Sequence, residues 1–226
     1  MSAGDHVVLV VDFGAQYAQL IARRVREARV YSEIVPHSIT AAEVAAKQPS
    51  AIILSGGPAS VYEEGAHNLD PAIYDLGIPM LGICYGAQLL ARDLGGSVER
   101  TGTGEYGRTE LTLTASSALT EGWPECSDVW MSHGDRIGTV PSGFDVHASS
   151  PEAPVAAFGS AERRVYGVQY HPEVAHTTHG QELIEAFLHH VAEIPAAWTH
   201  VSIIEEQVAR IRAQVGDERV LCALSG

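Results

Sequence analysis

The chain has 226 residues, of which 46% are hydrophobic and 19% are charged. This composition excludes an intrinsically disordered chain, because such chains are poor in apolar residues and rich in charge. With 14 Lys and Arg against 28 Asp and Glu, the formal net charge is −14. A surface this acidic argues against general affinity for nucleic acid or for anionic membranes, although it leaves room for a local basic pocket.

Cysteine usage and the N-terminus indicate the compartment. Cys84, Cys126 and Cys222 are odd in number and include no C-x-x-C pair, which indicates free thiols in a reducing environment. Met1–His6 lacks the basic and apolar regions of a signal peptide. No apolar run reaches the roughly 18 residues that a membrane span needs. We therefore expect a cytoplasmic protein with no membrane partner.

Strand and helix signals alternate in chain order through the first half of the sequence. The expected strands are 6–11, 30–35, 51–54 and 79–83, and the expected helices are 16–28, one that begins after Thr40, and 86–94. The strands are short aliphatic runs, typical of strands buried on both faces. Strands separated by helices predict an α/β fold with a mostly parallel central sheet flanked by helices.

The helix signal fades after about residue 97, where short β-rich pieces alternate with turns. These pieces are 107–113, 128–131, 144–148, 155–158 and 164–170, and a helix is expected at 180–191. We interpret the pieces as a small antiparallel extension of the sheet.

A second unit is expected near the end of the sequence. Ile194–Ala197 has the composition of a linker, and an amphipathic helix at 201–215 and a strand at 219–224 follow it. The sequence ends at Ser225–Gly226, just as that strand ends. We expect a first domain at 1–194, and at 195–226 a linker with the truncated beginning of a second domain.

A cysteine lies between an expected strand and an expected helix in Gly82-Ile83-Cys84-Tyr85-Gly86. This G-x-C-x-G pattern predicts a sharp elbow that presents the sulfur beside a helix N-terminus, which favours the thiolate. Asp12 and Gly56–Gly57 also follow strands, so we expect them at the same edge of the sheet. A buried structural cysteine is the alternative interpretation.

His171-Pro172-Glu173 follows the expected strand at 164–170 and therefore reaches the same edge. A nucleophilic thiol needs a base, and the base needs a group that orients it. His171 suits the first role and Glu173 the second. A loop histidine beside a solvated glutamate is the alternative.

The glycine-rich turn Leu54-Ser55-Gly56-Gly57-Pro58 offers backbone amides at this edge. Such amides can point at an oxyanion. The amide of Gly57, together with that of Tyr85 just after the cysteine, would form an oxyanion hole with two donors. A plain turn between strand and helix explains the glycines equally well.

The order and spacing of these motifs resemble a known family. Gly82–Gln88, the upstream Ser55–Pro58 turn and the downstream His171–Glu173 resemble the class I glutamine amidotransferases. More particularly, four further segments are similar to the amidotransferase domains of the GMP synthase family: Asp12–Tyr17, Glu105–Gly107, Trp130–Asp135 and Val168–Val174. The resemblance covers about residues 6–192 and implies a flavodoxin-like arrangement of the α/β sheet.

The resemblance implies hydrolysis of L-glutamine to glutamate and ammonia. Cys84 would attack the side-chain amide, and the amides of Gly57 and Tyr85 would hold the oxyanion. His171, oriented by Glu173, would transfer protons. The ammonia would serve the ATP-dependent amination of XMP to GMP by a synthetase domain.

The resemblance also implies a glutamine pocket. Gln88 would contact the polar head of the substrate, and the pocket would be completed by backbone groups at Ala59, Ser132, Gly134 and Asp135. A surface helix residue is the alternative for Gln88, and a hairpin turn is the alternative for 132–135.

Other histidines are weaker candidates. His133 could be mistaken for the base, but we prefer His171 because Glu173 lies close to it in the sequence. The remaining candidates, His176, His179, His189 and His190, lack the spacing of a ligand set, so we expect no metal site.

The end of the sequence bears on cofactors and partners. Val220–Gly226 is similar to the strand that opens an ATP pyrophosphatase domain, but only Ser225 and Gly226 of the pyrophosphate-binding loop are present. The resemblance implies ATP and Mg²⁺ for that synthetase domain, no cofactor for residues 1–226, and a homodimeric full enzyme. Two alternatives stay open: an amidotransferase of anthranilate or carbamoyl phosphate synthesis, and a catalytically silent partner-binding module.

Overall fold

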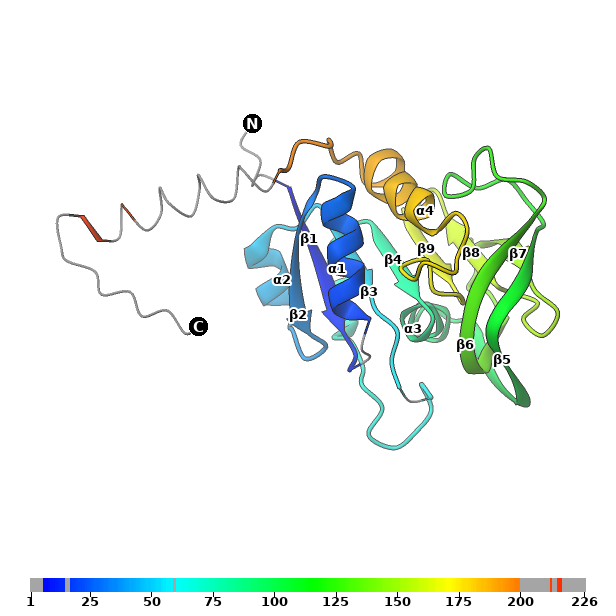
Figure 1. The fold of residues 1–226 in the computed structure, drawn as a ribbon. Coiled ribbons are helices and arrows are strands. Elements are labelled where there is room, and N and C mark those ends of the chain that lie inside the picture. Colours follow the sequence, from blue (N-terminus) through cyan, green and yellow to red (C-terminus); the bar gives the residue numbers. More distant parts are fainter. Residues whose placement is uncertain (1–5, 15–16, 59, 200–211, 213–214, 217–226) are drawn as a thin grey trace, which may run out of the picture.

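The computed structural model describes residues 6–14, 17–58, 60–199, 212 and 215–216. Within these residues, one sheet has the strand order β2-β1-β3-β4-β9-β8-β7-β5-β6 (Figure 1). Its parallel half consists of β1 (Val7–Asp12), β2 (Tyr31–Pro36), β3 (Ala51–Leu54), β4 (Met80–Ile83) and β9 (Val165–Val168). The order of these five strands is the flavodoxin-like one. The predicted α/β fold with a central sheet flanked by helices is therefore confirmed. The sheet as a whole is mixed and not mostly parallel, because the pairs among β5, β6, β7, β8 and β9 are antiparallel.

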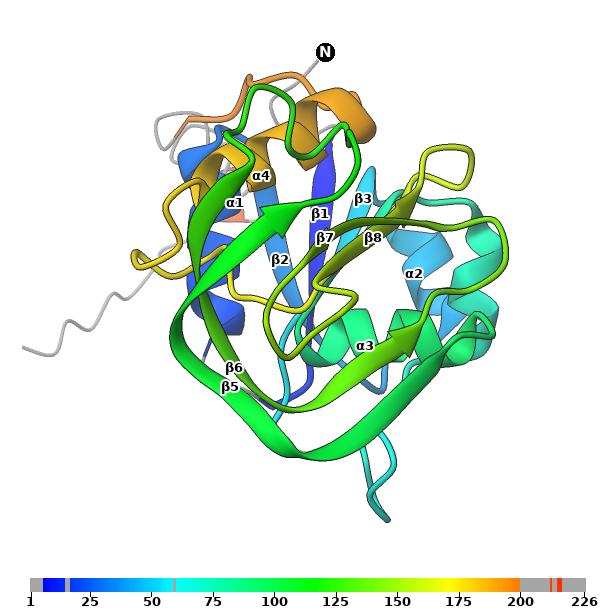
Figure 2. The same ribbon diagram turned by 90° about the vertical axis from the view of Figure 1, so that its right-hand side faces the viewer.

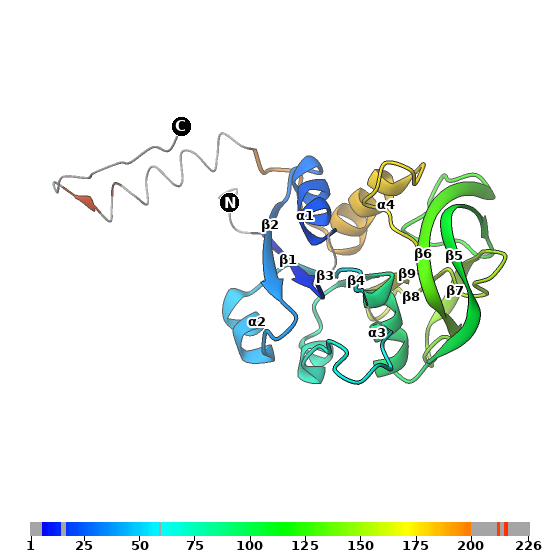
Figure 3. The same ribbon diagram turned by 60° about the horizontal axis from the view of Figure 1, so that its bottom comes forward.

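Helices cover both faces of the parallel half (Figure 3). One face carries α1 (Ala18–Glu27) and α4 (Gly180–Ala186), and α4 continues into a π-helical turn, η2 (Phe187–Val191). The other face carries α2 (Ala41–Lys47), α3 (Tyr85–Asp93) and the 3₁₀ helix η1 (Pro71–Leu76). The sheet is thus the middle layer of three, with a hydrophobic core on each side.

The residues of β1 show why this layering follows from the sequence. Val8 and Val10 pack in the core beneath α1 and α4, and Leu9 and Val11 pack in the core beneath α2 and α3. All four are essentially inaccessible to solvent. Since successive side chains of a strand point to opposite faces, a continuous aliphatic run needs apolar cover on both.

The predicted start of α2 is present as a capping box. The Thr40 hydroxyl accepts a hydrogen bond from the Glu43 backbone N–H at 3.3 Å, and the Glu43 carboxylate accepts one from the Thr40 N–H at 2.8 Å. This reciprocal pair satisfies two backbone donors that the first helical turn leaves without an intrahelical partner.

The antiparallel half is larger than the small extension that the sequence suggests. It contains β5 (Ser97–Leu113), β6 (Cys126–Thr139), β7 (Asp145–Ser149) and β8 (Ala157–Ser160). Figure 2 shows β5 and β6 as a long curved ribbon. Residues 132–135 lie inside β6, so the alternative of a hairpin turn at this place is wrong. Polar residues and glycines weaken the strand signal there, and cross-strand pairing overrides it.

The segment after η2 packs back onto the parallel half. The Trp198 side chain is buried, its backbone N–H donates to the Arg29 carbonyl at 2.8 Å, and its ring lies 6.4 Å from that of Tyr31. The expected strand at 219–224, and the expected helix at 201–215 except for residues 212 and 215, lie outside the described residues. Within the described ranges, no helix combines the length and apolar character needed to cross a bilayer.

Candidate active site

The candidate catalytic residues gather where the parallel strands end. Since β1, β3, β4 and β9 are parallel, their carboxyl ends meet at one edge of the sheet. Hydrogen bonds tie the ends together: the Ser55 hydroxyl accepts from the Phe13 N–H at 3.1 Å, and the Val168 carbonyl accepts from the Cys84 N–H at 2.8 Å. On the other side of the turn, the Gly86 N–H donates to the Ser55 carbonyl at 3.1 Å, so the Cys84 turn is held by the ends of both neighbouring strands.

Cys84 occupies a sharp turn between β4 and α3. Its backbone angles are φ 51° and ψ −105°, a conformation that a residue with a side chain rarely adopts. The turn also brings backbone segments together, since a Cβ added at Gly82 would lie 2.6 Å from the Gly86 carbonyl oxygen. A Cβ at Gly86 would lie 2.5 Å from the Leu54 carbonyl oxygen. The predicted elbow is thus present, and its two glycines are needed for close packing.

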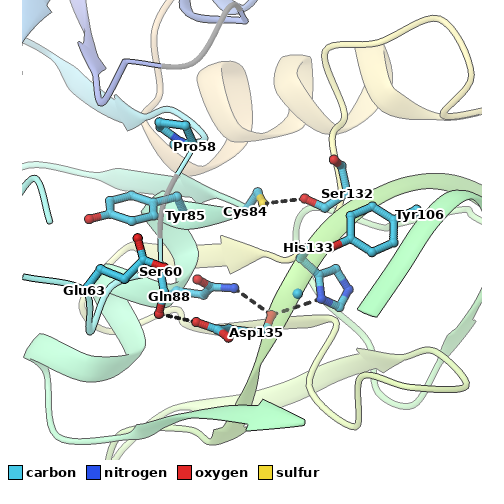
Figure 4. Close-up of a pocket in the computed structure, with 12 residues that line it drawn as sticks. Pro58, Ser60, Glu63, Cys84, Tyr85, Gln88, Tyr106, Ser132, His133 and Asp135 are labelled. Atoms are coloured by element: carbon cyan, nitrogen blue, oxygen red, sulfur yellow. Dashed lines mark hydrogen bonds between the residues drawn. The ribbon is translucent and has the colours of Figure 1, made fainter. Parts of the chain in front are cut away.

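The sulfur of Cys84 lies among polar groups, although the residue is buried. The thiol can donate to the backbone carbonyl of Ser132 at 3.6 Å (Figure 4). From the end of β9, the side-chain amide of Gln169 donates to the sulfur at 3.8 Å. Cys84 is also the residue before the first turn of α3, where the free N–H groups of the helix favour negative charge.

His171 and Glu173 form a buried pair beside the sulfur. The imidazole Nδ1 lies 2.7 Å from the Glu173 carboxylate, and both side chains are almost fully buried. Burial by itself lowers the pKa of His171, but hydrogen bonds with Cys84 and Glu173, and the charges of these groups, raise the pKa to about 11. A protonated imidazole is an electrostatic partner for a thiolate at Cys84.

The loop that carries His171 and Glu173 is held on both sides. The Thr177 hydroxyl donates to the His171 carbonyl at 2.6 Å and accepts from the Trp130 N–H of β6 at 3.0 Å. From α1, the Arg24 guanidinium donates to the Glu173 carbonyl at 2.9 Å. The positions of the base and its partner are therefore fixed by elements far apart in the sequence.

The two proposed oxyanion donors, Gly57 and Tyr85, both line the pocket in front of Cys84. Tyr85 is the first residue of α3, so its N–H has no acceptor within the helix. In the described part of the chain, neither N–H donates to a backbone or side-chain acceptor. Both donors are therefore free to bind an anionic oxygen.

A pocket of about 360 Å³ opens in front of the sulfur (Figure 4). Of the residues expected to bind the substrate, Gln88, Ser132, Gly134 and Asp135 line it, and Ala59 lies outside the described residues. Reasoning from the sequence assigns no role to five further lining residues: Pro58, Ser60, Glu63, Tyr106 and His133. Of these, Pro58, Tyr106 and His133 belong to the motifs of the family resemblance, and nothing local points to Ser60 or Glu63.

Asp135 joins three segments around this pocket. Its carboxylate accepts a hydrogen bond from the Ser60 hydroxyl, and its backbone carbonyl accepts one from the Gln88 side-chain amide at 2.8 Å (Figure 4). The loop after β3, the helix α3 and the strand β6 therefore meet at one residue. Gln88 is buried and faces the pocket, which contradicts the alternative of a surface position.

Each ring nitrogen of His133 faces an acceptor of the protein. Nε2 lies 3.2 Å from the Glu105 carboxylate and Nδ1 lies 3.0 Å from the Asp135 carbonyl. Burial lowers the pKa of His133, and this effect exceeds the opposite influence of Glu105. In the described residues, no group of three or more His, Cys, Asp and Glu side chains is arranged to hold a metal ion.

Comparison with known proteins identifies the family. The family model of the class I glutamine amidotransferases matches residues 9–191. The chain belongs to this family. Among curated proteins, the amidotransferase is 59% identical over 226 residues to "GMP synthase [glutamine-hydrolyzing]" of Streptomyces coelicolor, and 58% identical to the protein of the same name from Nocardia farcinica. In both matches the alignment covers 100% of this chain and 43% of the relative.

Solved structures agree with the amidotransferase assignment. A protein from Thermoplasma acidophilum, described as a GMP synthase subunit, has a TM-score of 0.75 and 32% identity, with 90% of this chain and 98% of that chain covered. A glutamine amidotransferase from Thermotoga maritima has a TM-score of 0.67 at 20% identity, covering 83% of this chain and 98% of that one. The second similarity shows the shared fold alone.

Proposed function

We propose that this amidotransferase hydrolyses L-glutamine to L-glutamate and ammonia, with Cys84 as the nucleophile. The observation that carries the proposal is the position of the Cys84 sulfur between the buried His171–Glu173 pair and the pocket. The volume of about 360 Å³ lies in the range of small-molecule sites, and the lining is rich in polar groups that suit a zwitterionic amino acid.

The arrangement supports a reaction in two stages. The Cys84 thiolate attacks the side-chain carbonyl carbon of glutamine, and the N–H groups of Gly57 and Tyr85 bind the oxyanion that forms. His171 gives its proton to the departing nitrogen, so ammonia leaves and a thioester remains. His171 then removes a proton from water, which attacks the thioester and releases glutamate and the thiolate. Glu173 keeps the imidazole oriented and stabilises its charge throughout.

We further propose that the ammonia serves a synthetase domain that aminates XMP to GMP. The basis is the identity of 59% to a protein named as a GMP synthase, of which this chain matches 43%. ATP and Mg²⁺ would bind to that domain. The boundary between the two domains would lie near residues 194 and 195, and the full enzyme would be a cytoplasmic homodimer. Ser225 and Gly226, the expected first residues of its pyrophosphate loop, lie outside the described residues.

The direct test is incubation of the purified chain with L-glutamine, followed by measurement of both glutamate and ammonia. We expect both products in equal amounts and their loss in Cys84→Ala. Cys126→Ala is the matched control, because Cys126 is exposed at the start of β6 and does not line the pocket. The assay is repeated with a separately produced synthetase domain, ATP and XMP. Absence of both products under both conditions would rule out the glutaminase.

A further inference from the structure

One polar side chain beside the nucleophile has no role in the mechanism above. Gln169 follows β9 and is completely buried, and its amide nitrogen donates to the Cys84 sulfur at 3.8 Å. Its amide oxygen accepts a hydrogen bond from the Gln88 side chain at 3.3 Å. Burial of a carboxamide is unfavourable unless its groups are hydrogen-bonded, and here the partners are a pocket residue and the sulfur.

The Gln88 contacts fix which way the Gln169 amide is turned. Gln88 uses its –NH₂ group twice, toward the Asp135 carbonyl at 2.8 Å and toward the Gln169 amide oxygen at 3.3 Å. Because two –NH₂ groups cannot hydrogen-bond to each other's nitrogen, Gln169 must present its oxygen to Gln88 and its –NH₂ group to the sulfur. The orientation therefore follows from the network.

This orientation affects the two protonation states of Cys84 differently. The Ser132 carbonyl, at 3.6 Å from the sulfur, only accepts, so it interacts favourably with the thiol. The Gln169 –NH₂ group only donates, so it favours the thiolate, and donors to charged acceptors bind more strongly. The titratable groups that share the site are His171 and Glu173, His133 and Asp135 on β6, Glu63 after β3, Tyr85 on α3 and Tyr106 on β5.

We propose that Gln169 is a positioning residue that connects the substrate-contacting Gln88 to the Cys84 sulfur and stabilises its thiolate. This inference rests on the proposed glutaminase, in which Gln88 contacts glutamine. The chain Asp135–Gln88–Gln169–Cys84 joins β6, α3, β9 and the elbow through side-chain hydrogen bonds. Gln88 lines the pocket and Gln169 does not, so this chain of hydrogen bonds links the pocket to the nucleophile through a residue behind it.

The test measures alkylation of Cys84 by iodoacetamide as a function of pH, read by mass spectrometry of the Cys84 peptide. Gln169→Met keeps the side-chain length and removes the donor, and Gln169→Glu keeps the shape and places a carboxylate beside the sulfur. We expect the midpoint of the alkylation profile to rise by about 0.5–1 pH unit in Gln169→Met and by more in Gln169→Glu. Gln181→Met on α4, whose amide donates to the Arg24 carbonyl, is the matched control and should leave the profile unchanged.

Steady-state kinetics provide the second measurement. In Gln169→Met we expect kcat for glutamine to fall about 3- to 10-fold, corresponding to the loss of one hydrogen bond to the sulfur. Alkylation requires no glutamine, so failure of the glutaminase and failure of this inference are distinguishable. An unshifted midpoint in both Gln169 variants, each shown to be folded by a cooperative thermal transition, overturns the proposal. A shift in Gln169→Glu alone also overturns it, because added charge rather than the lost donor would then be the cause.

Discussion

The His133 Nε2 atom lies 3.2 Å from the carboxylate of Glu105, and both side chains are buried beside the substrate pocket. The Glu105 carboxylate also accepts hydrogen bonds from the Ser150 hydroxyl at 2.7 Å and the Glu152 N–H at 3.2 Å. His133 Nδ1 in turn faces the Asp135 carbonyl. Because each ring nitrogen of His133 lies beside one of these oxygens and not beside the thiol, the side chain connects β6 to β5 through Glu105.

Substitution of the two histidines should therefore have different effects. We expect His171→Ala to lower kcat/KM for glutamine by about 10²–10⁴-fold, the usual contribution of a general acid–base group. His133→Ala should lower kcat/KM by less than about 10-fold and reduce the free energy of unfolding by about 1–3 kcal/mol, since Glu105 loses a buried partner. Steady-state kinetics and urea denaturation check both values. Equal losses of activity would leave His171 unassigned as the base.

The pH dependence of stability should reveal the charge on His171. Its pKa is raised from 6.5 to about 11 in the folded chain, so its stabilising effect is complete below pH 6.5 and is lost as the pH rises through about 11. We expect the difference in unfolding free energy between wild type and His171→Gln to shrink steadily across this range. Urea denaturation at several pH values measures it. In a Cys84→Ala background, the pH-dependent part of this free-energy difference should be smaller, because Cys84 is one of the groups that raise the pKa of His171. A free-energy difference that does not change with pH would contradict a charged His171.

The sequence predicts those parts of the site that local chemistry determines. Glycines at 82 and 86 are required by the backbone contacts of the elbow, and His171 and Glu173 are separated by a single proline. These signals are contained within a few residues, so spacing alone reveals them. The parallel strands are equally visible, because a strand buried on both faces must be aliphatic throughout.

Other parts of the site depend on contacts between distant segments. The contact between Gln88 and Gln169 joins residues 81 positions apart, and that between Ser60 and Asp135 joins residues 75 positions apart. No periodicity or motif encodes such distances. The full length of β5 and β6 escapes prediction for a related reason, since polar strands are stabilised by their cross-strand partners and not by their own composition.

The backbone conformation of Cys84 predicts an order of stability among its variants. With φ 51° and ψ −105°, an alanine at this position keeps the strain, whereas glycine adopts such angles freely. Strain relief of about 1–3 kcal/mol exceeds the entropic cost of glycine in the unfolded chain, about 0.4–1 kcal/mol. We expect Cys84→Gly to be more stable than Cys84→Ala by about 1 kcal/mol in urea denaturation. Lower stability of the glycine variant would show that the elbow is unstrained.

Tyr170 offers a test of a buried group without a partner. Its ring lies in the core beneath α4, and its hydroxyl is completely buried with no hydrogen bond among the described residues. Burial raises the pKa of this phenol, which therefore stays neutral. An unsatisfied buried hydroxyl costs about 1–3 kcal/mol, and Phe removes it with little change in shape. We expect Tyr170→Phe to raise the free energy of unfolding by about 1 kcal/mol.

Tyr74→Phe is the control with the opposite expected sign. The Tyr74 hydroxyl donates to Asp93 at 2.8 Å, so its loss should lower the free energy of unfolding. Destabilisation by Tyr170→Phe would mean that the hydroxyl is hydrogen-bonded in solution.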